Sequence, residues 1–506
     1  MMTQALYYVI LFSIPTMPTR LRSKLLSIAL LMIVQMMGPI AIVRSQSSRA
    51  IQTTQIAQEN SKNEQIKQLV QKLKSTNPVV RSDAAYALGE MGESAKSAIP
   101  DLIMLFKDPD ARVRSRASHA LGSVGEPAIP DLISLLKDTD ARVRSNATYA
   151  LGRAGKFTEF TISNLIPLLK DSDAEVRSRA ADVLKYVGES IIPNLIPLLK
   201  DPDPDVRASA ASALGLIGES TIPNLIPLLK DSDAEVRSRT AYALGNMGKS
   251  AKSTIPNLIP LLKDAHPEVR ALTAFALGSM GEFARSAIPN LIPLLKDTDP
   301  EARARTVSAL ESIGESSIPY LIASLKKPKE EINFALIQAL ASMGKSVIPD
   351  LIPLLKDPNE RVRSSAAYTL GFMGESAKPI IPNLIPLLKD PKASVRASAL
   401  VSLGVMKESA KSLIPDLILL LKDPDVSVRS NAASIVGGMG ESTIPYLIPL
   451  LKDLDASVRV SAAFALGSMG ESAKFTIPNV IPLLKDPNKL VRQFAVDALK
   501  KLGYKP

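Results

Sequence analysis

The residue types that most often carry catalysis or hold metals are scarce in this chain. Its 506 residues include two histidines, His119 and His266, and no cysteine. The lack of cysteine excludes disulfides, thiolate zinc sites and a cysteine nucleophile, and two isolated histidines cannot build a histidine-rich metal centre. The sequence also contains neither a serine-nucleophile motif nor a phosphate-binding glycine loop. We therefore expect no catalytic residue, no metal site and no cofactor.

Arginine and aromatic side chains are better candidates, because they can recognise another protein. They stand two and five residues after a recurring Val-Arg dipeptide, and positions three residues apart share one helix face. An acid four residues earlier often balances the first position, as Glu175 does for Arg179. Arg112 and Arg142 replace that acid in two segments, which predicts an unpaired basic patch for an acidic protein partner. The candidate partner-binding residues are Arg112, Arg116, His119, Arg142, Tyr149, Arg153, Tyr242 and Phe275.

The overall charge argues against a nucleic-acid partner. The formal net charge is +11, but residues 1–45 hold four basic residues and no acid. The remainder is only mildly basic for its length, below the charge density of a dedicated nucleic-acid binder. We expect protein partners and no nucleic acid.

The Val-Arg dipeptide defines fourteen internal repeats. Successive repeats are offset by 30 or 33 residues, and the difference lies in one junction, which reads GESAKSAIP when long and GESTIP when short. An insertion confined to one junction marks a surface loop between similar units. The aligned residues are Arg81, Arg114, Arg144, Arg177, Arg207, Arg237, Arg270, Arg303, Asn333, Arg363, Arg396, Arg429, Arg459 and Arg492.

Each repeat divides into two helical patterns. The first, IPNLIPLLKD in its commonest form, is apolar nearly all round, as expected of a buried helix. Pro193 suits the first helical position, whereas Pro197 should bend the helix. The second pattern, residues 205–215, has small and apolar residues at helical spacing, and we expect Gly215 and Gly218 to end it.

A single helical hairpin of this size cannot bury its apolar faces, so the repeats must stack. We predict an all-α fold, a right-handed α-solenoid of about fourteen helical-hairpin repeats. The pattern P-x-L-I-P-L-L-K-D, then V-R and A-A-x-A-L-G, resembles the HEAT repeat across residues 64–504. The 30-residue version is similar to the short HEAT-like repeats of phycobilisome lyases.

The resemblance implies a role for the aspartate that precedes each arginine by six residues. In HEAT proteins such residues form a ladder, in which the arginine of one repeat meets the aspartate of a neighbour. A charge-assisted pair of this kind would fix the offset of successive repeats. The resemblance also implies that the second helices line the concave side. The predicted ladder residues are Asp171, Arg177, Asp201, Arg207, Asp231 and Arg237.

The ninth repeat, residues 324–344, departs from this pattern. Lys327 and Asn333 stand where the aspartate and the arginine are due, and joint loss is what a mutual pair predicts. We interpret this segment as a hinge, a docking surface or drift in a mid-array repeat.

The first 63 residues lie outside the repeats. PTRLRSK followed by LLSIALLMIV is typical of a basic and then apolar secretion signal, with Met17 as an alternative start. Because 25–43 is also long enough to span a bilayer, we predict for 1–45 either a signal peptide or a membrane anchor that contacts the membrane or the secretion machinery. Residues 46–63 are polar and predict a flexible linker, followed by the solenoid over 64–506.

These observations favour a non-catalytic scaffold. We expect an exported (periplasmic or extracellular) or membrane-anchored protein, monomeric, that binds protein partners through its second helices. The alternative, implied by the similarity to phycobilisome lyases, is a phycobiliprotein (bilin) lyase or a phycobilisome-associated chaperone.

Overall fold

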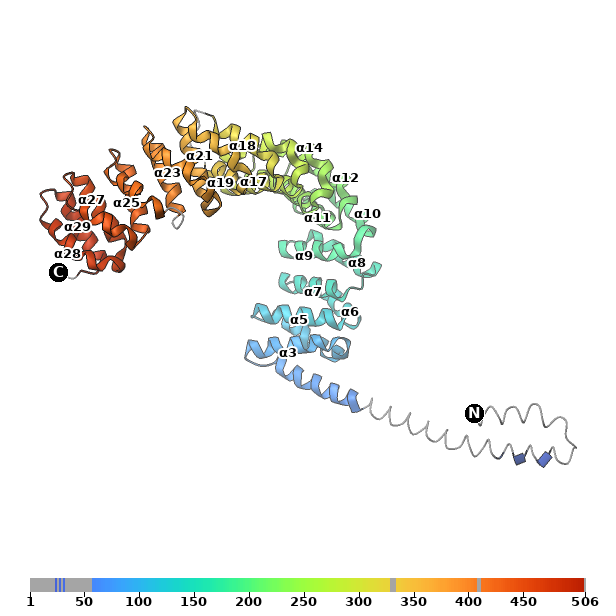
Figure 1. The fold of residues 1–506 in the computed structure, drawn as a ribbon. Coiled ribbons are helices and arrows are strands. Elements are labelled where there is room, and N and C mark those ends of the chain that lie inside the picture. Colours follow the sequence, from blue (N-terminus) through green and yellow to red (C-terminus); the bar gives the residue numbers. More distant parts are fainter. Residues whose placement is uncertain are drawn as a thin grey trace. The chain divides into compact units, whose positions relative to one another are not determined.

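The computed structural model describes residues 57–327, 334–406 and 411–504, together with the helical positions 23, 24, 27, 28 and 31. All regular structure within these ranges is helical. The chain divides into two compact units (Figure 1). The first holds Met1–Leu168 and Asp173–Val183, and the second holds Leu169–Ser172 and Leu184–Pro506.

The helices follow one another in pairs throughout the described chain. The first unit contains the helical residues 57–73, α3 (Pro78–Glu90), α4 (Ile99–Met104), α5 (Ala111–Val124), α6 (Ile129–Leu135), α7 (Ala141–Ala154), α8 (Glu159–Leu165) and most of α9 (Ala174–Leu184). The second unit contains α10 (Ile192–Leu195), α11 (Pro204–Ile217), α12 (Ile222–Leu225), α13 (Ala234–Asn246), α14 (Ile255–Leu258), α15 (Pro267–Ser279), α16 (Ile288–Leu291), α17 (Pro300–Ile313), α18 (Ile318–Leu325), α19 (Phe334–Ser342), α20 (Ile348–Leu351), α21 (Glu360–Phe372), α22 (Ile381–Leu384), α23 (Ala393–Val405), α24 (Ile414–Leu419), α25 (Val426–Gly438), α26 (Ile444–Leu450), α27 (Ala456–Ser468), α28 (Ile477–Val480) and α29 (Lys489–Lys501).

The odd-numbered helices α3 to α29 are the fourteen second helices of the repeats, and the even-numbered ones are first helices. Within each unit a second helix packs beside the second helix of the next repeat, as α3, α5 and α7 do. The core is aliphatic, with fully buried leucines such as Leu195 and Leu225 in the first helices and Leu214 in a second helix. This arrangement confirms the predicted all-α solenoid.

The second proline of IPNLIPLLKD changes the type of the first helix. In the repeat of α10 the α-helix ends at Leu195, and a 3-10 helix follows over Ile196–Lys200, with Pro197 as its second residue. A proline lacks the N–H that an α-helical bond requires, and the tighter helix accommodates that loss. In α18, where this proline is absent, the α-helix continues for eight residues. Pro449 is an exception and lies within α26.

Glycines of the A-L-G motif allow neighbouring second helices to approach closely. A Cβ atom on Gly215 would lie 2.4 Å from the Cβ of Ala243, and one on Gly278 would lie 2.8 Å from the Cα of Ala309. Gly215 lies inside α11, so the prediction that it ends the helix is wrong. Gly218, with a φ of 128°, does end it.

The two junction lengths correspond to two lengths of 3-10 helix. The long junction between α13 and α14 forms a seven-residue 3-10 helix, Gly248–Thr254. The short junction between α11 and α12 forms a three-residue one, Glu219–Thr221. The insertion is therefore absorbed almost entirely by the junction, since α11 and α13 have 14 and 13 residues and α12 and α14 have four each.

The segments predicted to precede the solenoid are described only in part. Residues 57–63, assigned to the polar linker, are helical and continuous with residues 64–73. The rest of the predicted linker, and the predicted leader apart from the five positions named above, lie outside the described residues. In the described chain, no single helix combines the length and the apolar character needed to cross a membrane, although α19 with Gly344–Lys356 meets both criteria as a pair bent by 110°.

Candidate binding face on the second helices

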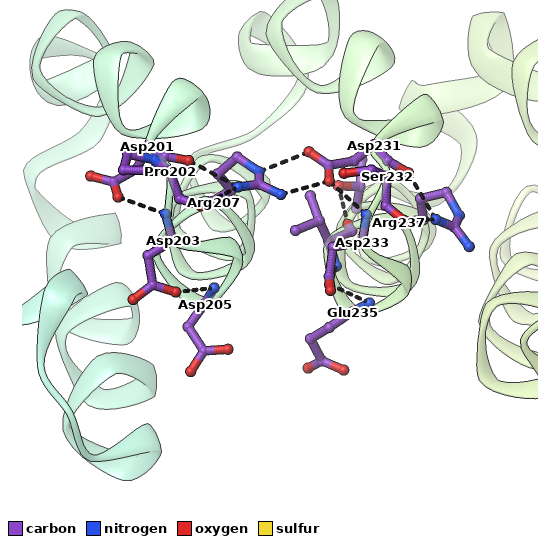
Figure 2. A network of polar contacts seen from close by, with 12 residues as sticks. Asp201, Pro202, Asp203, Asp205, Arg207, Asp231, Ser232, Asp233, Glu235 and Arg237 are labelled. Atoms are coloured by element: carbon purple, nitrogen blue, oxygen red, sulfur yellow. Dashed lines mark hydrogen bonds and ion pairs between the residues drawn. The ribbon is translucent and has the colours of Figure 1, made fainter.

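The recurring aspartate and arginine residues of neighbouring repeats form a ladder along the second helices, and Figure 2 shows the part of it around Arg207 and Arg237. Arg207 of α11 donates from Nη1 to the backbone carbonyl of Asp201 in its own repeat at 2.9 Å. Its Nε and Nη2 donate to the two carboxylate oxygens of Asp231 in the next repeat, each at 2.8 Å. One guanidinium group thus joins its own repeat to the following one. Arg237 does the same with the carbonyl of Asp231 and the carboxylate of Asp264.

The same two-point contact is found in six pairs whose arginine and next aspartate are 27 residues apart, which is the spacing of a long junction. These pairs are Arg81–Asp108, Arg237–Asp264, Arg270–Asp297, Arg363–Asp390, Arg396–Asp423 and Arg459–Asp486. Their side chains are largely removed from water, with Arg396 12% and Asp423 4% exposed. Of the remaining predicted ladder residues, Asp171 and Arg177 also have interaction partners.

The ladder pairs stabilise each other's charged forms. Burial by itself would raise the pKa of Asp264, but hydrogen bonds from Arg237 and from the backbone N–H of His266 hold that pKa below its ordinary value. The hydrogen bond to Asp264 is also the main reason that the pKa of Arg237 is raised. The pairs are therefore ionised at neutral pH, as a structural contact between repeats requires.

At several short junctions a lysine from the preceding first helix takes the arginine's place. The lysine Nζ contacts one oxygen of the aspartate, and both side chains are more exposed than in the arginine pairs. In the Lys107–Asp138 pair, for example, the two are 60% and 18% exposed. The pairs are Lys107–Asp138 at 3.3 Å, Lys170–Asp201 at 2.6 Å and Lys422–Asp453 at 2.7 Å.

Two ladder arginines beside such lysine pairs make the contacts to their own repeat but not the contact to the aspartate of the next repeat. Arg114 and Arg429 donate from Nη1 to backbone carbonyls of their own repeats. Within the described residues, the Nε–Nη2 edge of either side chain binds no carboxylate. Arg207, whose Asp231 is 24 residues away, shows that a short junction can also hold the two-point contact.

The variable positions form a second row of contacts, in which arginines lie over aromatic rings. In each case the arginine stands two residues after the ladder arginine, and the ring stands five residues after the ladder arginine of the preceding repeat. Arginine over an aromatic face gains electrostatic attraction from the ring quadrupole. The pairs are Arg116 over Tyr86 at 4.5 Å, Arg179 over Tyr149 at 5.3 Å and Arg305 over Phe275 at 5.5 Å from the ring centroid.

The predicted basic patch in the first unit is smaller than the sequence indicated. Arg112 and Arg116 lie exposed on α5. Arg142, however, forms an ion pair with Asp140, the residue that caps its own helix, at 2.8 Å between Nη2 and Oδ2. The prediction that Arg142 is unpaired is therefore wrong, because an N-cap aspartate stands two residues before it. Arg153 reaches the preceding repeat, where its Nε donates to Ser123 at 3.4 Å.

His119 contributes an aromatic ring to this patch and little positive charge. Burial is the main cause that lowers its pKa, and the charges of Arg153 and Arg116 lower it further. Its Nδ1 is buried and has no hydrogen-bond partner among the described residues, and its ring lies 6.4 Å from that of Tyr86. At neutral pH His119 is uncharged.

The other two candidates lie in the second unit and contact each other. Tyr242 of α13 stacks on Phe275 of α15, with ring centroids 5.5 Å apart and an angle of 24° between the planes. Tyr242 remains 41% exposed. The candidate residues thus fall into two groups, one in each compact unit.

In the ninth repeat, residues 328–333 lie outside the described chain, Asn333 among them. Arg303 of the eighth repeat bonds to the carbonyls of Asp297 and Thr298, and Lys327 occupies the position of the next aspartate. Phe334 is 57% exposed and meets Phe372 edge to face at 5.5 Å. The interpretation as a hinge, a docking surface or drift stays a prediction.

Sequence reasoning missed the lysine pairs and the partners of the aromatic rings. The signal for the ring partners was a spacing between repeats: Arg116, Arg179 and Arg305 each follow an aromatic residue by 30 residues. His119 and His266 lie in different repeats. Across the described residues, no group of three or more histidine, aspartate or glutamate side chains is placed to hold a metal ion.

The fold has relatives among solved structures. The karyopherin Kap121p bound to the SUMO protease Ulp1p and Kap121p bound to Pho4p each align with a TM-score of 0.50 and 17% sequence identity. Both alignments cover 88% of this chain and 57% of Kap121p, so the chain spans little more than half the length of that protein. At this identity the likeness concerns the fold alone. No curated protein matches the chain.

A family model for HEAT repeats matches most of the sequence. The matched stretches overlap and together leave only the first 41 residues and a short segment near residue 250 uncovered. They are residues 42–117, 66–152, 99–185, 162–245, 255–341, 318–404, 381–453 and 444–506. The chain belongs to the HEAT repeat family.

Proposed function

We propose that this protein is a non-catalytic scaffold that binds protein partners on the exposed face of its second helices. The main observation behind the proposal is that the recurring and the variable positions of the repeat have different roles. The recurring positions are used in the aliphatic core and the ladder, whereas the variable positions present arginine and aromatic side chains at the surface. Arginine and tyrosine are enriched where proteins bind one another. Kap121p, which has a similar fold, has been solved with bound protein partners.

The best candidate for the contact in the first unit is the group of Arg112, Arg116 and Tyr86. Arg112 has no side-chain partner in the described chain, and Arg116 lies over the exposed ring of Tyr86. An arginine held over a tyrosine ring keeps its charge and loses conformational freedom before binding, which lowers the entropic cost of association. Such a surface suits a partner with exposed carboxylates. We propose that the chain itself is a monomer.

The test is capture of partner proteins by the full chain, with cross-linking and mass spectrometry, repeated with the Arg112→Glu, Arg116→Glu double variant. A matched control carries Lys249→Glu and Lys345→Glu, the same charge change in junction segments away from the second helices. We expect partners of the wild-type chain to be retained by the control and lost by the double variant. Equal capture by all three proteins would contradict the proposed role of this face.

We also propose that the protein is exported or membrane-tethered by residues 1–45. The support is the basic segment 18–24 followed by the apolar segment 25–34. Fractionation of cells that produce the chain from Met1, from Met17 or from Gln46 tests this. The first two should place the repeats outside the cytoplasm, and the third should leave them inside. An identical distribution of all three would contradict the proposal.

A further inference from the structure

Three consecutive second helices near the end of the described chain enclose an apolar hollow. The hollow has a volume of about 330 Å³ and is lined from α25, α27 and α29. Its apolar walls include Val426, Val460, Leu490 and the edge-to-face ring pair Phe464–Phe494. Val426 is 68% exposed and Leu490 52% exposed. Most other repeats carry alanine or proline at the position of Val426 and a charged residue or serine at the position of Leu490. This volume is at the lower end for ligand sites and suits a few side chains.

One wall of the hollow is a ladder arginine with unused hydrogen-bonding capacity. Arg429 lines the hollow and donates from Nη1 to the carbonyls of Asp423 and Pro424, at 2.6 and 2.9 Å. The aspartate of the next repeat, Asp453, is held by Lys422 instead. The Nε–Nη2 edge of Arg429 therefore binds no carboxylate in the described chain, although the same edge of Arg396 binds Asp423 at two points.

The aromatic pair also borders a second hollow, whose lining includes several charged side chains. Phe464 and Phe494 line it together with Lys500, Lys501 and Asp497. The Nζ of Lys501 lies 5.5 Å from the centroid of the Phe464 ring. The two hollows share the ring pair Phe464–Phe494, and we refer to them together as the groove. Arg429 lines one hollow, and Lys500 and Lys501 line the other.

We propose that this groove binds a segment of a protein partner in which apolar side chains lie between acidic residues. The Nε–Nη2 edge of Arg429 receives one carboxylate in the bidentate geometry that the ladder aspartates use elsewhere. The apolar side chains cover Val460, Leu490 and the ring pair, and a second carboxylate meets the lysines. A ligand with a single carboxylate would satisfy only one hollow, which is why a peptide segment fits better than a small acid. The inference rests on the proposed protein-binding function and adds a site of different chemistry in the second unit.

Arg114 provides a matched control within the same chain. It has the same two carbonyl bonds, and its next aspartate is likewise held by a lysine. Arg114 does not line the apolar groove. Its replacement by glutamine therefore removes the same charge and the same local bonds as Arg429→Gln, without touching the groove.

The experiment measures fluorescence anisotropy of a labelled peptide, two leucines and a phenylalanine flanked on each side by two glutamates, titrated with the full chain. We expect saturable binding that Arg429→Gln weakens about tenfold, whereas Arg114→Gln changes it by less than about twofold. Leu490→Asp, at an exposed position that tolerates substitution, should also weaken binding. Replacing either the glutamates by glutamine or the apolar residues by serine should abolish it.

Several outcomes would overturn the inference. They are no binding by the wild-type chain, equal weakening by Arg429→Gln and Arg114→Gln, and binding of the serine peptide as tight as that of the original. Circular dichroism of each variant shows whether the solenoid is intact, and Leu490→Asp keeps the test valid if Arg429→Gln unfolds. Capture of partners that depends on Arg112 and Arg116, without binding of this peptide, would leave the proposed function standing and remove only this site.

Discussion

The long and the short junctions of this solenoid hold their repeats together in different ways. Across the long junction between α13 and α15, Arg237 binds Asp264 at two points, and both side chains are nearly buried. Across the short junction between α5 and α7, Asp138 is held by the exposed Lys107 at one point, and Arg114 is left with backbone carbonyls. Three residues of loop thus bias which cation meets the aspartate.

The comparison shows that repeats with the same arginine and aspartate can still differ in the contact that joins one repeat to the next. A bidentate, largely buried pair restricts both the distance and the angle between two repeats, whereas an exposed lysine restrains only a distance. The short junction before Asp231 keeps the arginine contact, so loop length biases the choice without dictating it. Short junctions are therefore where a ladder arginine can become available to a ligand.

The largest expected effect separates the two kinds of pair. Asp264→Ala leaves Arg237 largely buried without its carboxylate and should lower the local stability by about 2–3 kcal/mol. Asp138→Ala removes a pair that is mostly exposed on its lysine side and should cost about 1 kcal/mol or less. Native-state hydrogen exchange of the flanking helices measures each loss, since a repeat array need not unfold in one step. Equal losses of stability in the two variants would contradict the proposed difference between the two kinds of pair.

A second prediction converts a short junction into a long one. Insertion of Ala-Lys-Ser after Ser442 turns GESTIP into GESAKSTIP and should allow Arg429 to bind Asp453. The new bidentate contact should stabilise α25 and α27 by about 1–2 kcal/mol and abolish peptide binding in the groove. The same insertion after Ser316 is the control, because Lys327 replaces the aspartate there and no pair can form. A gain in both variants would show that the loop alone is responsible.

A third prediction concerns acid. The folded-state pKa values of Asp108, Asp231, Asp264, Asp297, Asp390 and Asp486 lie below the ordinary value. A lowered pKa contributes stability above the unfolded value of about 3.9, and this contribution is lost as the pH falls towards the folded value. Urea denaturation should therefore show a loss of stability below about pH 4, reduced in Asp264→Asn. An unchanged pH profile in that variant would contradict the ionised ladder.

The smallest expected effect tests the arginine–aromatic row. Arg305 and Arg239 each bind a glutamate four residues earlier at 2.7 Å, but only Arg305 also lies over a ring, that of Phe275. Arg305→Gln should cost about 0.5 kcal/mol more than Arg239→Gln, because cation–π contacts at exposed sites are worth about that much. Thermal denaturation of both variants provides the measurement, and a larger loss for Arg239→Gln would contradict the assignment.

Much of the fold was predictable because the same helical pattern recurs in repeat after repeat. The two helices, the buried leucines and the starting proline follow from periodicity and from the conformational limits of proline. The prediction for Gly215 was wrong because the sequence alone does not distinguish a glycine that ends a helix from one that allows a neighbouring helix to approach closely. Pro197 was expected to bend a helix, and the structure shows a change to 3-10 geometry.

The candidate site was less predictable because its contacts join different repeats. Arg142 was predicted to be unpaired on the basis of the residue four positions away, whereas its partner, Asp140, caps the same helix. The choice between Lys422 and Arg429 for Asp453 depends on the geometry of a junction, which the length of the junction biases but does not dictate. The residues could be named from the sequence, but their partners could not.

The most direct test of this account is a pair of double-mutant cycles, one at Arg237 and Asp264 and one at Arg114 and Asp138, each residue changed singly and together to glutamine and asparagine. Hydrogen exchange of the flanking helices gives the coupling energy of each pair. The account predicts a coupling of about 2 kcal/mol across the long junction and none beyond error across the short one. Equal coupling energies in the two cycles would contradict the claim that junction length biases the contact.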